Sequence, residues 1–302
     1  MVTRPVRLPE GDALVATLAR LGFSDRDTIA VVERAPERER QPEIWSVLER
    51  ARDRLVASID KPGQLDLVPP GAGELAAPEA LLGVYVFLSA LVDILAWHED
   101  RGVTKAVSWA TLSDLGRHVD TYHRFHGRVG FNEEGWLSLH FRGLLFQLGR
   151  LQFERAQIRS QLCLDRSLLD AAGPGQEILD IHIPEAGPLR PELCSESLAA
   201  TGPFFDRHFP DEDYRVGLCT SWLLDEQLAE YLPESSNIVQ FQRRFTLLRG
   251  AKVDDEAIVR FVFRKLGGPS ADLPQRTTLE RAVLAHVRSG RHWHVRTGWL
   301  VL

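Results

Sequence analysis

Hydrophobic residues in the first 130 positions recur at helical spacing. Leucines three to four positions apart predict a helix over 12–22, and Gly22 is suited to end it. Ser24, with an acidic residue three positions later, predicts the N-cap of the next helix. The same spacing predicts further helices over 44–55, 78–97 and 107–125. This part of the chain is therefore expected to be rich in helix.

The most apolar stretch, residues 80–92, lies inside one of these predicted helices. Glu79 and Asp93 bound it, and it is shorter than the roughly 20 residues that a membrane-spanning helix needs. We therefore interpret it as a buried core helix and expect no membrane association. The first residues, MVTRPVRLPEGD, lack the apolar region of a signal peptide.

Strand patterns and helix patterns alternate in the second half. Residues 143–157 are strand-like, with Gly149 interpreted as a bulge. Further strands are predicted over 178–184, 214–224, 258–263 and 292–302, and helices over 191–209, 225–232 and 278–288. Such alternation is typical of α/β units. A composition shift over 160–176 predicts two domains, 1–160 and 161–302.

Composition narrows the choice of partners and compartment. With 44% hydrophobic and 26% charged residues, the 302-residue chain has the balance of a soluble globular protein. A net charge of −6 gives no general attraction to nucleic acid or anionic lipid, so neither partner is expected. Three cysteines without paired spacing indicate buried packing in a reducing, cytoplasmic setting. They are Cys163, Cys194 and Cys219.

The strand predicted over 178–184 carries the most informative polar pair. Alternation places Asp180 and His182 on one face, and the apolar residues between them on the other. Pro184 lacks a backbone donor, so strand pairing is expected to stop or splay there. The pattern indicates a sheet face that lines a cleft, because ligands of α/β sheets bind at such strand ends. The alternative is a histidine on a solvent-facing edge.

The loop 185–190 enters a predicted helix. It contains Gly187, Leu189 and Arg190, and a helix N-terminus offers free N–H groups and a positive dipole end to an anion. An ordinary Gly-Pro turn is the alternative interpretation.

The strand predicted over 214–224 ends in Ser221 and Trp222, which we expect to line a pocket. Small residues alternate along one of its faces and allow close approach of a ligand or of a neighbouring strand. Asn237 follows downstream, in a segment that is also suited to cap a helix.

Several enzyme classes are disfavoured by missing motifs. The chain has no GxSxG elbow, Walker loop, HExxH motif or CxxC pair. His118, His123 and His126 lie close together on a predicted helix, and they fit an exposed polar face better than a metal site. We expect no metal.

Five segments together resemble a known family. They are RGLLFQLGRLQFER, LDIHIPEAGPL, SESLAATGPFFDRHFP, VGLCTSWLLDEQLAEYLPESSNIVQFQRRF and GRHWHVRTGWLVL. They are similar to a bacterial, largely actinobacterial, family of two-domain GNAT-like acyltransferases, which includes the N-acyltransferases of teicoplanin-type glycopeptides. The resemblance covers most of the chain and is strongest from about residue 143 onward.

The resemblance implies a mixed α/β fold of two GNAT-like lobes, the first helix-rich, with a cleft between them. The resemblance implies acyl-CoA as a co-substrate and no permanently bound cofactor. It implies that acyl-CoA binds where the strand of His182 diverges from the strand of Ser221. The implied CoA-binding residues are Gly187, Leu189, Arg190, Ser221, Trp222 and Asn237. The usual pyrophosphate signature of spaced glycines is absent, and Gly187 stands alone in the corresponding loop.

Two functions follow. The first is transfer of an acyl group from a CoA thioester to a small amine acceptor, with His182 as the base and Asp180 or Glu185 orienting it. Residues two apart on a strand are separated by about 6.6 Å of rise, so a direct bond from Asp180 needs a leaning side chain. The second is a catalytically inactive GNAT-like ligand-binding or regulatory protein. Sequence specifies neither the amine, the acyl chain length nor the oligomeric state.

Overall fold

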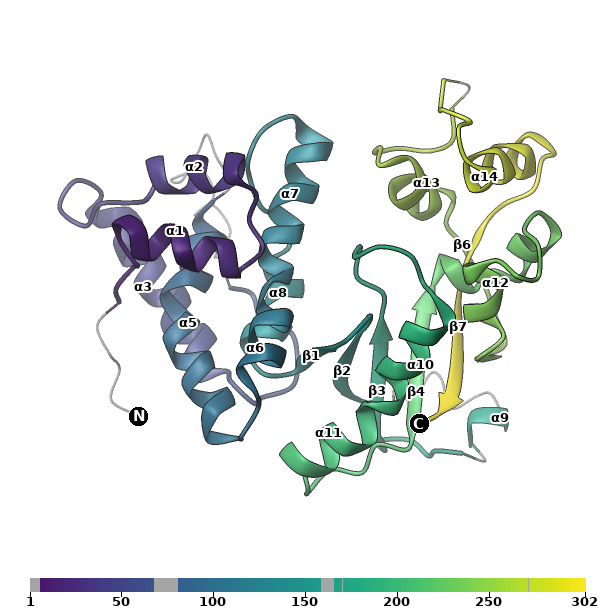
Figure 1. The fold of residues 1–302 in the computed structure, drawn as a ribbon, viewed down its shortest axis with the longest axis horizontal. Coiled ribbons are helices and arrows are strands. Elements are labelled where there is room, and N and C mark those ends of the chain that lie inside the picture. Colours follow the sequence, from purple (N-terminus) through teal and green to yellow (C-terminus); the bar gives the residue numbers. More distant parts are fainter. Residues whose placement is uncertain (1–5, 68–80, 159–165, 170, 271) are drawn as a thin grey trace. The chain divides into compact units, whose positions relative to one another are not determined.

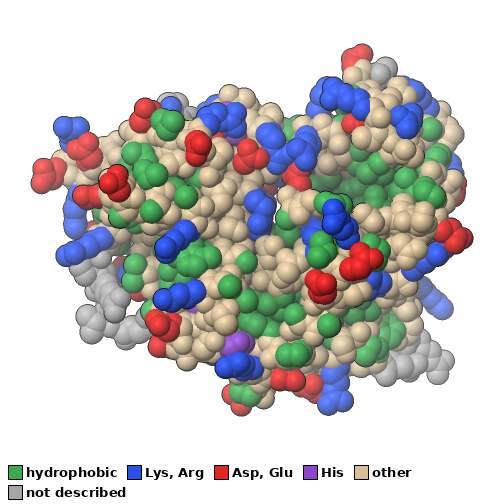
Figure 2. All heavy atoms as spheres, in the orientation of Figure 1, with side chains coloured by type: hydrophobic (Ala, Val, Ile, Leu, Met, Phe, Trp, Pro, Cys, Tyr) green, Lys and Arg blue, Asp and Glu red, His purple; other side chains and the backbone are tan. Residues whose placement is uncertain are grey.

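A computed structural model describes residues 6–67, 81–158, 166–169, 171–270 and 272–302. The chain divides into two compact units, residues 1–147 and residues 148–302 (Figure 1). The domain boundary predicted at residue 160 lies within the second unit, and residues 159–165 and 170 of the composition shift lie outside the described residues. Acidic and basic side chains both occur on each unit over the face shown in Figure 2.

The first unit is rich in helix, as predicted. Its described helices are α1 (Gly11–Arg20), α2 (Asp25–Glu33), α3 (Pro42–Ala57), α5 (Leu82–Asp100), α6 (Lys105–Leu112), α7 (Asp114–His126) and α8 (Glu134–Phe141). The predicted N-cap is confirmed, since the Ser24 side chain accepts a bond from the Asp27 N–H at 3.2 Å. The single helix predicted over 107–125 is wrong. It breaks at Ser113, whose hydroxyl donates to the Ala110 carbonyl at 2.8 Å and so favours a helix end.

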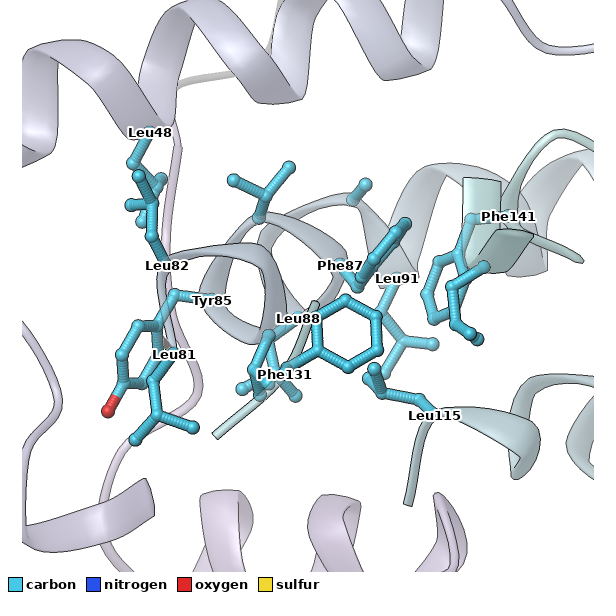
Figure 3. Close-up of a cluster of buried hydrophobic side chains, with 14 of the residues drawn as sticks. Leu48, Leu81, Leu82, Tyr85, Phe87, Leu88, Leu91, Leu115, Phe131 and Phe141 are labelled. Carbon is cyan, nitrogen blue, oxygen red and sulfur yellow. The ribbon is translucent and has the colours of Figure 1, made fainter. Parts of the chain in front are cut away.

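Helix α5 is the centre of the first unit's core (Figure 3). The Phe87 ring centroid lies 4.6 Å from that of Phe141 and 5.9 Å from that of Phe131. By length and composition alone α5 could cross a membrane, but most of it is buried inside the unit. The prediction of a buried core helix is therefore confirmed.

The described strands form a seven-stranded mixed sheet. They are β1 (Leu145–Leu148), β2 (Leu151–Gln157), β3 (Glu177–His182), β4 (Val216–Ser221), β5 (Thr246–Leu247), β6 (Lys252–Val253) and β7 (His294–Val301). The order is β1-β2-β3-β4-β7-β5, and β6 pairs with β7. Only β3 and β4, among the pairs whose register is described, run parallel. Gly149 lies in the turn between β1 and β2, with φ at 66°, rather than in the predicted bulge.

Short helices complete the second unit. They are α9 (Arg166–Leu169), α10 (Pro191–Ala199), α11 (Thr201–His208), the 3₁₀ turns η2 (Trp222–Leu224) and η3 (Glu226–Glu230), α12 (Asn237–Gln242), α13 (Asp255–Phe263) and α14 (Thr278–Arg288). The helix predicted over 191–209 is two helices that meet at Ala200. The strand predicted over 214–224 ends at Ser221, because the Ser221 hydroxyl caps the following 3₁₀ turn.

The strand predicted over 258–263 is wrong, because these residues belong to α13. The Asp254 side chain accepts a bond from the Ala257 N–H at 2.9 Å and begins the helix. Ile258 and Val259 are buried, whereas Phe261 is exposed. A short apolar run is compatible with either a buried strand or a buried helix segment. Here the cap at Asp254, which precedes the run, makes it a helix.

The two faces of the sheet differ in chemistry. Leu179 and Ile181 of β3 are buried on one face. The opposite face carries an apolar cluster around Ile178 and Leu218, and toward the carboxyl end of β3 it carries Asp180 and His182. The predicted alternation along this strand is confirmed.

Candidate active site

His182 forms a hydrogen bond with a carboxylate on the neighbouring strand. In the β2–β3 register Glu154 lies opposite Asp180 and Gln152 lies opposite His182, so all four side chains share one face. Nε2 of His182 lies 2.9 Å from Oε2 of Glu154, and the two side chains are 29% and 22% exposed. A carboxylate only accepts, so Nε2 of His182 is the donor in this bond.

The two carboxylates expected to orient His182 have other neighbours in the described structure. Glu185 pairs with Arg264, with Oε1 and Nη2 2.5 Å apart, and Asp180 lies across from Glu154 in the register. Sequence analysis missed Glu154, although Glu154 and Gln152 are two residues apart on a strand and so lie on the same face of the sheet. Finding it required the register of two strands that are separated by more than a dozen residues.

The carboxyl ends of β3 and β4 lie at the same edge of the sheet, because these strands are parallel. Their register comprises Leu179 opposite Gly217 and Asp180 opposite Leu218, so within the described strands His182 and Ser221 lie beyond it. The edge therefore brings together the ends of the two strands that the sequence predicts to line a site.

The predicted pocket residues near β4 have defined local roles. The Ser221 hydroxyl accepts a bond from the Leu223 N–H at 3.1 Å. The half-buried Trp222 ring is stacked on Phe261, with centroids 6.4 Å apart. Asn237 is the first residue of α12, and the N-cap is its neighbour Ser236. Helix α12 is joined to η2, because Gln242 donates to the Leu223 carbonyl at 2.8 Å.

The β3–α10 loop, residues 183–190, is fixed by a buried arginine. The Arg150 side chain donates from Nη1 to the Pro184 carbonyl at 3.1 Å, from Nη2 to Gly187 at 2.7 Å and from Nε to Pro188 at 3.2 Å. Gly187 has a φ of 90°, which favours glycine. Leu189 is buried, and the exposed Arg190 is the N-cap residue of α10. Sequence analysis missed Arg150.

A second arginine contacts the first turn of α10. Nη2 of Arg244 donates to the Pro191 carbonyl and to the Ser195 hydroxyl, each at 2.8 Å. Burial raises the pKa of the Cys194 thiol, and the charges of Arg150 and Arg244 oppose that rise. Positive charge therefore reaches the start of α10. Cys194 and Cys219 are buried, as predicted, and Cys163 lies outside the described residues.

The histidines of α7 bind carboxylates of the first unit. Nδ1 of His123 lies 2.6 Å from Asp27, and Nε2 of His118 lies 3.4 Å from the buried Asp114. Burial of Asp114 opposes its charge, but His118, His140 and Arg117 hold its pKa well below the usual range. Within the described ranges, no group of three or more metal-ligating side chains is present.

Comparisons with known proteins cover both units. Residues 12–143 match the N-acyltransferase N-terminal domain, and residues 145–300 match the GNAT-like C-terminal domain. Crystal structures of an acyltransferase in complex with decanoyl-CoA and teicoplanin are similar at 41% identity, covering 99% of this chain and 91% of that chain with a TM-score of 0.88. Two further complexes, with decanoyl-CoA alone and with CoA and 10C-teicoplanin, are 40% identical over 99% of this chain and 90% and 91% of theirs, each with a TM-score of 0.88. No curated protein matches the chain.

Proposed function

Since the chain belongs to the family of acyltransferases that join an N-acyltransferase N-terminal domain to a GNAT-like C-terminal domain, we propose that it transfers a fatty acyl group from CoA to an amine of a glycopeptide. The similar structures contain decanoyl-CoA and teicoplanin, which supports a medium-length acyl chain and this class of acceptor. The family resemblance inferred from the motifs is confirmed. The observation that carries the proposal is the His182–Glu154 pair at the carboxyl edge of β3.

The proposed reaction is direct attack of the amine nitrogen on the thioester carbonyl. The C–N bond forms as the C–S bond breaks, and the departing CoA thiolate takes up a proton. His182 accepts the proton that the amine loses, at Nδ1, while Nε2–H stays bonded to Glu154. The carboxylate orients the ring and stabilises the imidazolium that forms, so Glu154 acts through His182.

The proposed place of the acyl-CoA is the edge where β3 and β4 end. The described register of these strands ends at Asp180 and Leu218, and pantetheine has amides that can pair with strand backbone beyond it. The β3–α10 loop leads into the N-terminus of α10, where the helix dipole favours the CoA pyrophosphate. Ser221 and Trp222 lie at the end of β4, on the same edge.

Release of CoA thiol from decanoyl-CoA, followed with a thiol-reactive chromogen in the presence of deacylated teicoplanin, tests the proposal. We expect one acyl group in the product for each thiol released, by mass spectrometry. His182→Ala should lower kcat by roughly 10²–10⁴-fold and leave the Kd for CoA unchanged, because a positioned base contributes about this much. A protein that binds CoA but acylates no amine would favour the inactive ligand-binding alternative, which the lone Gly187 of the loop supports.

A further inference from the structure

We infer that Arg150 is a positioning residue for acyl-CoA. It fixes the conformation of the β3–α10 loop, which the spaced glycines of the usual pyrophosphate signature would otherwise determine. This inference rests on the proposed function, because it assumes that the loop meets the CoA pyrophosphate. Arg150 is 8% exposed, and each of its three guanidinium nitrogens donates to a different carbonyl of the loop. Bonds from a charged donor are about twice as strong as neutral ones, so the loop has a well-defined conformation.

The direction of the carbonyls sets the direction of the neighbouring N–H groups. In a planar trans peptide the C=O and the following N–H point in opposite directions. The Pro184 and Pro188 carbonyls accept from Arg150, so the N–H groups of Glu185 and Leu189 point away from it. The guanidinium therefore fixes the direction of two backbone N–H groups of the loop. In glycine-rich loops the backbone donors reach phosphate in the same way, through conformations that glycine permits.

Arg150 is itself positioned by α10. The Ser197 hydroxyl accepts from the Arg150 N–H at 2.7 Å and from the Leu151 N–H at 3.3 Å. A Cβ on Gly149 would lie 2.9 Å from the Ser197 hydroxyl, so the left-handed glycine of the β1–β2 turn permits this approach. Arg150 therefore joins the turn to α10 through its backbone N–H and to the loop through its side chain.

Substitution of Arg150 is compared with substitution of Arg155. Arg155 lies on β2, the strand that begins directly after Arg150, is similarly buried and binds Glu212, but it donates to no loop carbonyl among the described bonds. Arg150→Lys keeps the charge and loses the planar set of donors, and Arg155→Lys is the matched control. The substrates are octanoyl-CoA and octanoyl-pantetheine, which lacks the pyrophosphate.

We expect Arg150→Lys to raise the Kd for CoA and the KM for octanoyl-CoA by about tenfold, with kcat near wild type. Its kcat/KM with octanoyl-pantetheine should stay within about twofold, and Arg155→Lys should change neither substrate's KM. A wild-type Kd in Arg150→Lys, or equal losses with both substrates, would overturn the inference. If Arg150→Lys does not fold, Arg150→Gln is measured instead, because it also removes the three guanidinium bonds to the loop, and an unchanged Kd there has the same meaning. Wild-type protein that binds no CoA would instead refute the proposed function.

Discussion

Replacement of Glu154 by glutamine tests how much the carboxylate contributes to His182. The amide keeps the shape and one acceptor oxygen but removes the charge, 2.9 Å from Nε2. Both side chains are partly exposed, so we take an effective dielectric constant of about 40 and a charge separation of about 4 Å, which gives about 2 kcal/mol for the imidazolium. The hydrogen bond from His182 Nε2–H to the amide oxygen of the glutamine retains part of this stabilisation. The expected loss is about 1.4 kcal/mol, or about tenfold in kcat.

The assay is thiol release under saturating decanoyl-CoA and acceptor, with the Kd for CoA measured alongside. Asp180→Asn is the matched control, because it removes a carboxylate from the same sheet face, directly opposite Glu154. We expect it to change kcat less than threefold, roughly 0.6 kcal/mol. Wild-type kcat in Glu154→Gln would refute the orienting role. A larger loss in Asp180→Asn would restore the orienter predicted from the sequence.

Two further predictions concern the first unit. Neither ring nitrogen of the buried His98 has a hydrogen-bond partner among the described residues, and burial lowers its pKa to about 4. In the unfolded chain the His98 ring takes up a proton near pH 6.5, whereas in the folded protein it does so only near pH 4. The free energy of unfolding therefore falls as the pH drops from 6.5 to 4, by about 3 kcal/mol in all. His98→Phe should therefore flatten the change in unfolding free energy between pH 7 and 4.5, measured by urea titration, and an unchanged slope would contradict this. Gly116→Ala should destabilise by about 1–3 kcal/mol, because its Cβ would lie 2.3 Å from the Gly22 backbone. Gly135→Ala, which meets nothing within 4 Å, is the control for thermal unfolding, and equal losses would contradict the argument.

Local pattern predicted much of the fold because its signals lie within a few residues. The N-cap at Ser24, the apolar α5 and the alternation along β3 depend on neighbours in the chain, and all three are confirmed. The strand predicted over 258–263 failed for the complementary reason. Its apolar run is too short to distinguish the two periods, and the deciding cap at Asp254 lies outside it.

The site was predictable only in part. His182 and the loop after it stand out along the chain, since a polar residue in an apolar strand and a glycine before a helix are local features. Glu154 and Arg150 reach their partners across 28 and up to 38 positions, through strand register and loop packing. The spacing of residues along one strand or helix contains no information on such distant pairs. For this reason the carboxylates expected to orient His182 were Asp180 and Glu185, which are near it in sequence.

The position of β7 has a consequence for how the second unit is made. β7 lies between β4 and β5 in the sheet, although it follows both along the chain. Until residues 294–301 leave the ribosome, β4 has an open edge and β5 lacks its partner. The first unit forms from contacts among residues that are already synthesised. It can therefore fold while the second unit still lacks β7. Nascent chains are therefore expected to depend on chaperones mainly between the synthesis of β4 and that of β7, when an incomplete sheet is exposed to pairing with other chains.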